Sequence, residues 1–187
     1  MFLEILVLAE LAVRPAHGYE LKKRIHQDLA GQVQLNSNTV YPALRRFTTA
    51  GLVTATEERI PGRPSRQVYR LTPAGRDHLH SLLVSFDDTL ARRGEEFWTR
   101  VAFFDLLSKD ERRVVLDARA RALAAHRDTL TGLGVRADAE PGPDPEQASG
   151  AWSVEVVDLQ LRLVAAEQQW LANLTTRLGD PADGATP

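Results

Sequence analysis

Residues 36–72 read NSNTVYPALRRFTTAGLVTATEERIPGRPSRQVYRLT, and this stretch decides the fold. Up to Gly51 the apolar residues recur at helical spacing, and a projection at about 100° per residue puts Val40, Leu44 and Phe47 on one face. Beyond that glycine, apolar and polar residues alternate on both sides of PGRPS, which is turn chemistry. The stretch therefore predicts one helix that ends at Gly51, followed by a β-hairpin.

Pro42 restricts where this helix can begin. A proline has no N–H to donate, so it costs least in the first turn of a helix. We therefore expect Asn38 or Thr39 to be the N-cap, because both side chains can accept a hydrogen bond from the first free amides.

The surrounding sequence predicts further helices. Two helices are expected before the hairpin, over 2–13 and from His17 or Gly18 to Ala30. After it, Thr72 caps a helix with Pro73 at its first position. From there we expect one long helix over 74–105, a helix from Ser108 to about Thr131, a flexible loop over 132–150 and a last helix over 151–178.

Three compact helices followed by a two-stranded hairpin are the winged helix-turn-helix arrangement. The predicted fold is therefore mainly α. It has a winged-helix domain over 1–72 with a two-stranded β wing, a C-terminal helical dimerisation and effector module over 73–178, and a disordered tail over 179–187.

Charge is distributed unevenly along the 187 residues. Residues 1–80 hold 11 Lys/Arg against 7 Asp/Glu, a net of +4, and the remaining residues hold 12 against 18, a net of −6. A basic half in a chain that is acidic overall suggests that this half meets a polyanion.

Several classes of protein are disfavoured. The chain has no cysteine, so a disulfide or thiolate chemistry is excluded. We expect a cytoplasmic protein, because the apolar start carries acids and lacks a basic leader. No nucleotide-binding loop or hydrolase motif is present, so we expect neither an enzyme nor a cofactor. His78 and His80 lie two residues apart on a helix, about 200° around it, so no metal site is expected.

The outward face of the helix that ends at Gly51 has an unusual composition. No Asp or Glu occurs between Asn36 and Thr56, whereas amide, hydroxyl and guanidinium side chains are present. Such groups bind phosphates and base edges in the major groove. We expect this face and the hairpin tip to contact DNA through Asn38, Thr39, Tyr41, Pro42, Arg45, Arg46, Thr49, Arg63, Ser65 and Arg66.

Three blocks of the sequence resemble the PadR family of bacterial transcriptional regulators. They are HGYELKKRI (17–25), NSNTVYPALRRFTTAGLV (36–53) and GRPSRQVYRLTPAGRDHL (62–79). The resemblance implies a dimer that binds an inverted-repeat operator, with the C-terminal helix packed on the partner's N-terminal helix. It also implies a DNA contact by Ser37. Tyr19 is a further expected DNA contact. Phe47 stands where leucine is more usual in the family, and we expect it in the core.

The helical module holds all three tryptophans, which have two possible roles. The tryptophans are Trp98, Trp152 and Trp170. They either pack in the core and the dimer contact or, together with Phe104, line a pocket for a flat aromatic effector. The last helix also carries a near-heptad apolar seam. The residues expected to make the dimer are Leu3, Leu6, Val156, Leu159, Leu163 and Trp170.

The sequence thus predicts a homodimeric DNA-binding repressor released by a small apolar or aromatic effector. Two alternatives stay open. One is a winged helix that binds only proteins, and the other is a MarR-like regulator.

Overall fold

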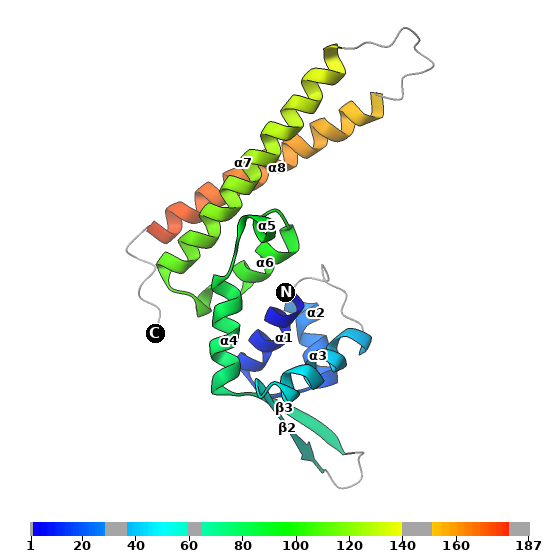
Figure 1. The fold of residues 1–187 in the computed structure, drawn as a ribbon, viewed down its shortest axis with the longest axis vertical. Coiled ribbons are helices and arrows are strands. Elements are labelled where there is room, and N and C mark those ends of the chain that lie inside the picture. The colour runs from blue at the N-terminus through cyan, green and yellow to red at the C-terminus, as the bar shows by residue number, and fades with distance from the viewer. Residues whose placement is uncertain (1, 29–36, 60–64, 140–150, 180–187) are drawn as a thin grey trace. The chain divides into compact units, whose positions relative to one another are not determined.

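The computed structural model describes residues 2–28, 37–59, 65–139 and 151–179, which form a mainly helical protein (Figure 1). The elements are α1 (Phe2–Val13), β1 (Ala16–His17), α2 (Gly18–Asp28), α3 (Ser37–Thr49), β2 (Val53–Glu58), β3 (Arg66–Leu71), α4 (Pro73–Val84), α5 (Asp88–Ala91), α6 (Gly94–Ala102), the 3₁₀ helix η1 (Phe104–Leu106), α7 (Lys109–Ala139) and α8 (Ala151–Gly179).

The chain forms two compact units. The first comprises Met1–Ser85 and Gly94–Ser108, and the second comprises Phe86–Arg93 and Lys109–Pro187. The first unit therefore extends further along the chain than the predicted domain over 1–72, because α4 and α6 both contact α1. Below, each unit is described by itself.

The first unit is the predicted winged helix. Helix α1 is apolar almost all round, and its residues 5–11 are buried. It lies against α2 and α3, which contribute core residues such as Ile25 and Leu44. Burial of Val40, Leu44 and Phe47 confirms the predicted core face of α3.

The wing is part of a three-stranded antiparallel sheet in the order β1-β3-β2. Strands β2 and β3 pair from Val53 opposite Leu71 to Glu58 opposite Arg66, as the alternating pattern predicted. Strand β1 was not predicted, because two residues are too few to show an alternating pattern. It places His17 opposite Val68.

The two ends of α3 differ in how well they were predicted. Gly51 has a φ of 72° and ends the helix as expected. The start was wrong, because α3 begins at Ser37 and not after an N-cap at Asn38 or Thr39. Pro42 therefore lies in the second turn. The helix tolerates it there at the cost of one backbone hydrogen bond, and burial of Val40 and Leu44 on the opposite face offsets this cost.

Thr72 joins the end of α3 to the start of α4. Its side chain is the N-cap of α4 and accepts a hydrogen bond from the Gly75 N–H at 3.0 Å. Its hydroxyl also lies 2.8 Å from the Gly51 carbonyl and 3.0 Å from the Leu52 carbonyl, which share its one hydrogen. The backbone N–H of Thr72 donates to the same Leu52 carbonyl at 3.0 Å.

The single long helix predicted over 74–105 was wrong. Helix α4 ends at Val84, and α5, α6 and η1 follow as separate short helices. The break is stabilised by Arg100, which is fully buried in the first unit. Its guanidinium donates to the carbonyls of Leu82 and Ser85, both at 3.0 Å, and these carbonyls lie at the end of α4. A continuous helix would have satisfied them internally.

Glu96 balances the buried charge of Arg100. One carboxylate oxygen accepts from the Arg100 guanidinium at 2.9 Å, and the other accepts from the Phe2 N–H at 3.1 Å. Burial opposes the ionisation of Glu96, but these hydrogen bonds outweigh it and lower the pKa of Glu96 below its ordinary value.

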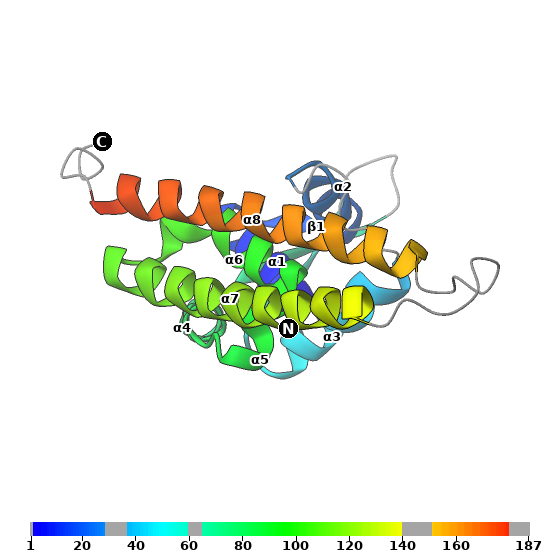
Figure 2. The same cartoon turned by 90° about the horizontal axis from the view of Figure 1, so that it is seen from above.

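In the second unit α7 and α8 lie side by side along their length (Figure 2). Helix α7 continues to Ala139, so the loop predicted over 132–150 was wrong for its first eight residues. A glycine costs a helix only about 1 kcal/mol, and Leu133 between the two glycines and Arg136 and Ala137 after them favour the helix. Residues 140–150 lie outside the described part, as does the predicted tail apart from Gly179, which ends α8.

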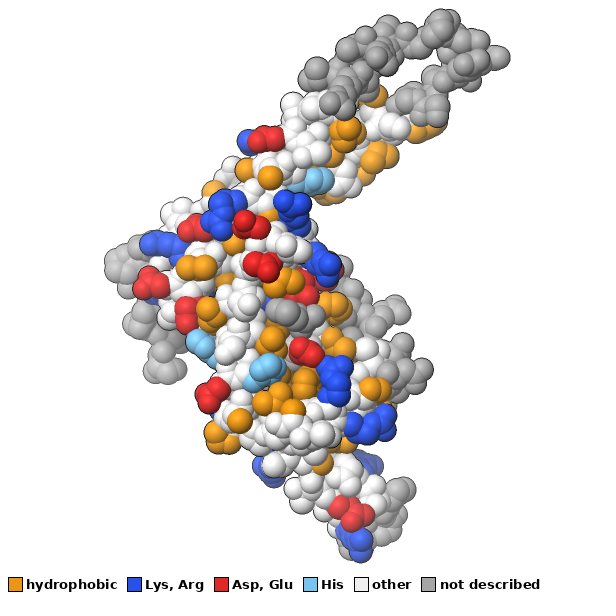
Figure 3. Space-filling model, viewed as in Figure 1, with side chains coloured by type: hydrophobic (Ala, Val, Ile, Leu, Met, Phe, Trp, Pro, Cys, Tyr) orange, Lys and Arg blue, Asp and Glu red, His pale blue; other side chains and the backbone are white. Residues whose placement is uncertain are grey.

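Helix α8 packs on α7 through a second row of apolar residues, outside the predicted seam. Val164 and Leu171 are buried, whereas Val156, Leu159 and Leu163 on the predicted seam are each more than half exposed. Figure 3 accordingly shows apolar side chains on the surface of the α7–α8 pair. In the described part of the chain no helix is long and apolar enough to cross a membrane.

Candidate nucleic-acid interface

Helix α3 presents a polar, basic face opposite its buried one. Tyr41, Pro42, Arg45 and Thr49 are exposed, as the projection predicted, and Thr39 is half-buried. Ser37 and Asn38 lie in the first turn of α3, and their side chains are outside the described part. The exposed face can therefore offer hydroxyl and guanidinium donors to an anion.

Arg46 lies on the flank of α3 and has a partner within the protein. Its guanidinium donates to the Glu4 carboxylate at 2.6 Å and lies 5.7 Å from the centre of the Phe47 ring. A DNA contact by Arg46 would have to compete with that ion pair. Of the two arginines predicted on α3, Arg45 is therefore the better placed.

The wing carries the second group of predicted contacts. Ser65 and Arg66 are exposed at the start of β3, and Arg63 lies outside the described residues. Glu57 pairs with Arg59 at 3.1 Å, and the hydrogen bonds from Arg59 and then Ser65 lower the pKa of the Glu57 carboxyl. Acidic and basic side chains thus lie close together on the wing.

His17 contacts both strands of the wing near the tip end of the β2–β3 ladder. It belongs to β1, its Nδ1 lies 3.2 Å from the Gln67 carbonyl of β3, and its Nε2 lies 3.3 Å from a Glu58 carboxylate oxygen of β2. From the sequence, His17 is expected to cap a helix, to lie on the surface or to hydrogen-bond a phosphate. The contacts could not be foreseen, because β1 itself was not predicted.

A cleft of about 610 Å³ lies between the wing and the helices. It is lined by His17, Gly18, Tyr19, Glu20, Tyr41, Ser65, Arg66, Gln67 and Tyr69. Tyr19 is 77% exposed and Tyr41 40% exposed at its rim. Burial, and then the neighbouring Tyr41, raise the pKa of the Tyr69 phenol.

Gly18 allows α2 and α3 to approach each other at this cleft. A Cβ atom at Gly18 would lie 2.6 Å from Cε1 of Tyr41, which is closer than van der Waals contact permits. The glycine of the HGYE block therefore fixes the position of the Tyr41 ring. The predicted residues Tyr19, Tyr41 and Arg66 meet around one cleft as a result.

Comparison with known proteins assigns this arrangement. Residues 6–81 match the family model described as the transcriptional regulator PadR-like family. The matched segment holds the winged helix of the first unit, which therefore has the sequence pattern of this family. The protein is thus a transcriptional regulator of the PadR-like type, and the MarR-like alternative is not needed.

Individual relatives of this PadR-like regulator have low sequence identity to it. It is 23% identical over 141 residues to the negative transcriptional regulator PadR of Bacillus subtilis strain 168, covering 74% of this chain and 78% of that one. The crystal structure of Bacillus subtilis PadR with operator DNA is 20% identical over 95% of this chain and 99% of that chain, with a TM-score of 0.46. The structure of the same protein with p-coumaric acid is 20% identical over 96% of each chain, with a TM-score of 0.41.

The four predicted effector residues of the PadR-like regulator do not meet within either unit. Trp98 and Phe104 belong to the first unit, where Phe104 is buried, and Trp152 and Trp170 belong to α8 in the second. The latter two are 18 residues apart, or about 27 Å along a helix. One small pocket in α8 cannot include both.

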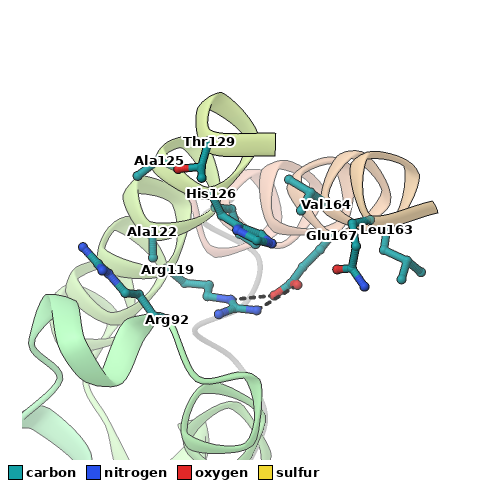
Figure 4. Close-up of a pocket in the computed structure, with 11 residues that line it drawn as sticks. Arg92, Arg119, Ala122, Ala125, His126, Thr129, Leu163, Val164 and Glu167 are labelled. Carbon is teal, nitrogen blue, oxygen red and sulfur yellow. Dashed lines mark hydrogen bonds and ion pairs between the residues drawn. The ribbon is translucent and has the colours of Figure 1, made fainter. Parts of the chain in front are cut away.

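The second unit has a different cleft, of about 560 Å³, between α7 and α8 (Figure 4). Its lining residues are Arg92, Arg119, Ala122, Leu123, Ala125, His126, Thr129, Gln160, Leu163, Val164 and Glu167. At one end Arg119 donates to both carboxylate oxygens of Glu167, at 2.7 and 2.9 Å, and to the Ala91 carbonyl at 2.7 Å. This ion pair ties α8 to α7 and α5.

The residues predicted for dimerisation are placed as follows. On α8, Val156, Leu159 and Leu163 are exposed, and Trp170 is 36% exposed. On α1, Leu3 is half-buried, but Leu6 is only 1% exposed and contributes to the core of its own unit. Leu6 is therefore unavailable to a partner. Among the described residues no group of three or more metal-ligating side chains occurs.

Proposed function

We propose that this PadR-like regulator is a homodimeric repressor that binds operator DNA through α3 and the wing. The observation that carries the proposal is the exposed face of α3, which presents Tyr41 and Arg45 without an acid, beside the exposed Arg66 of the wing. Tyrosine, arginine and backbone groups are the usual partners of phosphates and base edges. The name of the Bacillus relative, a negative regulator, supports repression.

The two arginines have different expected roles. Arg45 lies on the outward face of the helix, where a guanidinium can reach guanine in the major groove, and Arg66 lies on the wing, where backbone phosphates are expected. In a dimer two such helices would enter successive major grooves about 34 Å apart. We therefore expect an inverted-repeat operator, bound in the cytoplasm.

The test is binding of a labelled duplex from the upstream region of the regulator's own gene, measured by fluorescence anisotropy over a series of salt concentrations. Several neutralised phosphates should give a steep loss of affinity with salt. Arg66→Gln should weaken binding to all duplexes alike, and Arg45→Gln should cost about 1–3 kcal/mol and relax preference at one base pair. Arg113→Gln, an exposed change on α7, is the control.

The interaction-module alternative makes the opposite prediction. A winged helix that binds only proteins would show weak binding to every duplex, with no effect of Arg45→Gln beyond that of Arg113→Gln. That result would reject the proposed function.

Dimerisation is proposed to use the exposed seam of α8. Leu159 and Leu163 of this seam are each 54% exposed, and their spacing suits packing against a neighbouring helix. Leu159→Glu should convert the dimer to a monomer in light scattering. Ala165→Glu, at an exposed position on a different face of α8, should leave the dimer intact. Monomers from both variants, or from neither, would place the dimer contact elsewhere.

The effector is proposed to bind in the cleft between α7 and α8 and not beside the tryptophans. The small side chains of Ala122 and Ala125 leave room for a flat ring, and the His126 ring, which extends toward α8, can meet a negative group. Cinnamate is a suitable probe. It should release DNA from the wild type and from Ala120→Phe, outside the cleft, but not from Ala125→Phe, which fills it. Equal responses of the two variants would reject this site.

A further inference from the structure

We propose that His17 is a positioning residue for the wing and that it acts in its doubly protonated form. The inference rests on the proposed DNA binding but concerns a residue outside the predicted contacts. β1 pairs with β3 alone, but the His17 side chain contacts both strands of the wing, next to the last pair of the β2–β3 ladder before the tip.

The two contacts of the His17 ring define its charge. The Gln67 carbonyl and the Glu58 carboxylate are both hydrogen-bond acceptors, and they lie at 3.2 and 3.3 Å from the two ring nitrogens. A neutral imidazole has one N–H and can donate to only one of them. Both contacts at once therefore need the imidazolium ion.

The contact with Glu58 also affects the charge that DNA meets. Glu58 is opposite Arg66 in the β2–β3 ladder, so its carboxylate lies on the strand next to the wing's exposed arginine. An unneutralised carboxylate there would repel phosphate. Imidazolium at His17 neutralises Glu58 and holds β2 and β3 at the spacing that presents Arg66 outward.

The other charged or titratable groups around His17 are not expected to change charge near neutral pH. In the cleft they are Glu20 of α2, Tyr41 of α3, and Arg66 and Tyr69 of β3, with Glu58 on β2. Carboxylates, phenols and guanidinium groups ordinarily keep one charge between pH 6 and 8, whereas imidazole changes its own. In this neighbourhood, the pH dependence of DNA binding should therefore arise at His17.

The expected effect follows from the exposure of the pair. The side chains of His17 and Glu58 are 25% and 49% exposed, so the contact is partly screened. A pair of this kind should change affinity by about two- to fivefold per wing, and the two wings of a dimer should multiply the effect. DNA should bind more tightly at pH 6 than at pH 8 at fixed ionic strength.

The experiment compares full-length wild type with His17→Gln, Glu58→Gln and the double variant, on the duplex from the upstream region and on a scrambled duplex, at pH 6 and 8. His17→Gln should remove the pH dependence on both duplexes. Glu58→Gln should reduce it, and the double variant should match His17→Gln because the two residues act together. His26→Gln, exposed on α2, is the matched control.

Two outcomes would overturn the proposal. One is wild-type pH dependence in His17→Gln. The other is full pH dependence in Glu58→Gln, which would mean that His17 touches phosphate directly and does not act through the wing.

A measurement without DNA separates this inference from the proposed function. Amide hydrogen exchange in peptides covering 53–58 and 66–71 should be faster in His17→Gln than in the wild type at pH 6 and equal at pH 8. If that difference were seen but no duplex bound, the proposed function would fail and the positioning role would stand. If exchange were equal at both pH values, the positioning role would fail whatever the affinity for DNA.

Discussion

Replacing Arg100 by methionine tests why the segment after the wing folds into short helices. The change keeps most of the side-chain volume but removes donors to four acceptors: the Leu82 and Ser85 carbonyls at 3.0 Å, and the carbonyl and carboxylate of Glu96 at 2.8 and 2.9 Å. The side chain of Glu96 is only 3% exposed, so its charge would stay buried without its main partner.

Removing one partner of a buried ion pair costs about 3–5 kcal/mol, which is a large part of the stability of an ordinary domain. We expect Arg100→Met to lower the free energy of unfolding of the first unit by that amount, measured by urea denaturation followed by tryptophan fluorescence. The double variant with Glu96→Gln should recover part of the loss. A loss below about 1 kcal/mol would refute the reasoning, because the four acceptors would then have found other donors.

Three further predictions concern the first unit. Gly75→Ala should lower the free energy of unfolding by about 1–3 kcal/mol, because a Cβ there would lie 2.1 Å from the Leu52 carbonyl oxygen; thermal denaturation measures it. Gly18→Ala should displace the Tyr41 ring and weaken DNA binding in anisotropy, with little change in unfolding. Stability should fall as the pH drops through the lowered pKa of Glu96, and Glu96→Gln should flatten the pH profile of urea denaturation.

Matched measurements make these predictions specific. Gly132→Ala, where a Cβ would meet nothing within 4 Å, should be neutral or stabilising, in contrast to Gly75→Ala. For the pH profile the sign follows from the linkage between protons and folding. A carboxyl whose pKa is lower in the folded state stabilises the protein above the unfolded pKa and loses that contribution as it is protonated. Constant stability from pH 6 down to pH 3 would contradict the role of Glu96.

The winged helix could be predicted from the sequence because the residues that define its elements lie close together along the chain. Apolar spacing identified the core face of α3 through Val40 and Phe47, Gly51 marked its end, and alternation on both sides of a Gly/Pro tip identified the wing. Each of these features depends on residues within one or two turns or strands of each other. The same is true of Thr72 as the N-cap of α4.

The failures arose where distant residues decide the structure. The apolar pattern over 74–105 fits a helix, but the break depends on Arg100 reaching carbonyls 15 and 18 residues earlier. On α8 two apolar stripes compete, and only packing against α7 selected Val164 and Leu171 for burial. Asp87 could have indicated the break, because its side chain caps α5 through the Leu90 N–H at 2.9 Å.

The candidate sites show the same division. Tyr41, Arg45 and Arg66 were predictable because they stand on elements whose faces the pattern revealed. The cleft between α7 and α8 was not, since it depends on the ion pair of Arg119 with Glu167, 48 residues apart. The contacts of His17 depend in turn on a strand pairing 50 residues away.

The hydroxyl of Thr72 has a mechanical consequence. It hydrogen-bonds to the Gly51 and Leu52 carbonyls, which follow α3, and it also caps the first turn of α4. The two helices are therefore rigidly connected at this residue. A signal that tilts α4 would therefore have to rotate α3 with it as a rigid body, because the chain between them could not bend instead. Control of transcription in such a dimer would then change the orientation of two intact winged helices. Each could still bind its half-site, but the two together would no longer match the half-site spacing of the operator.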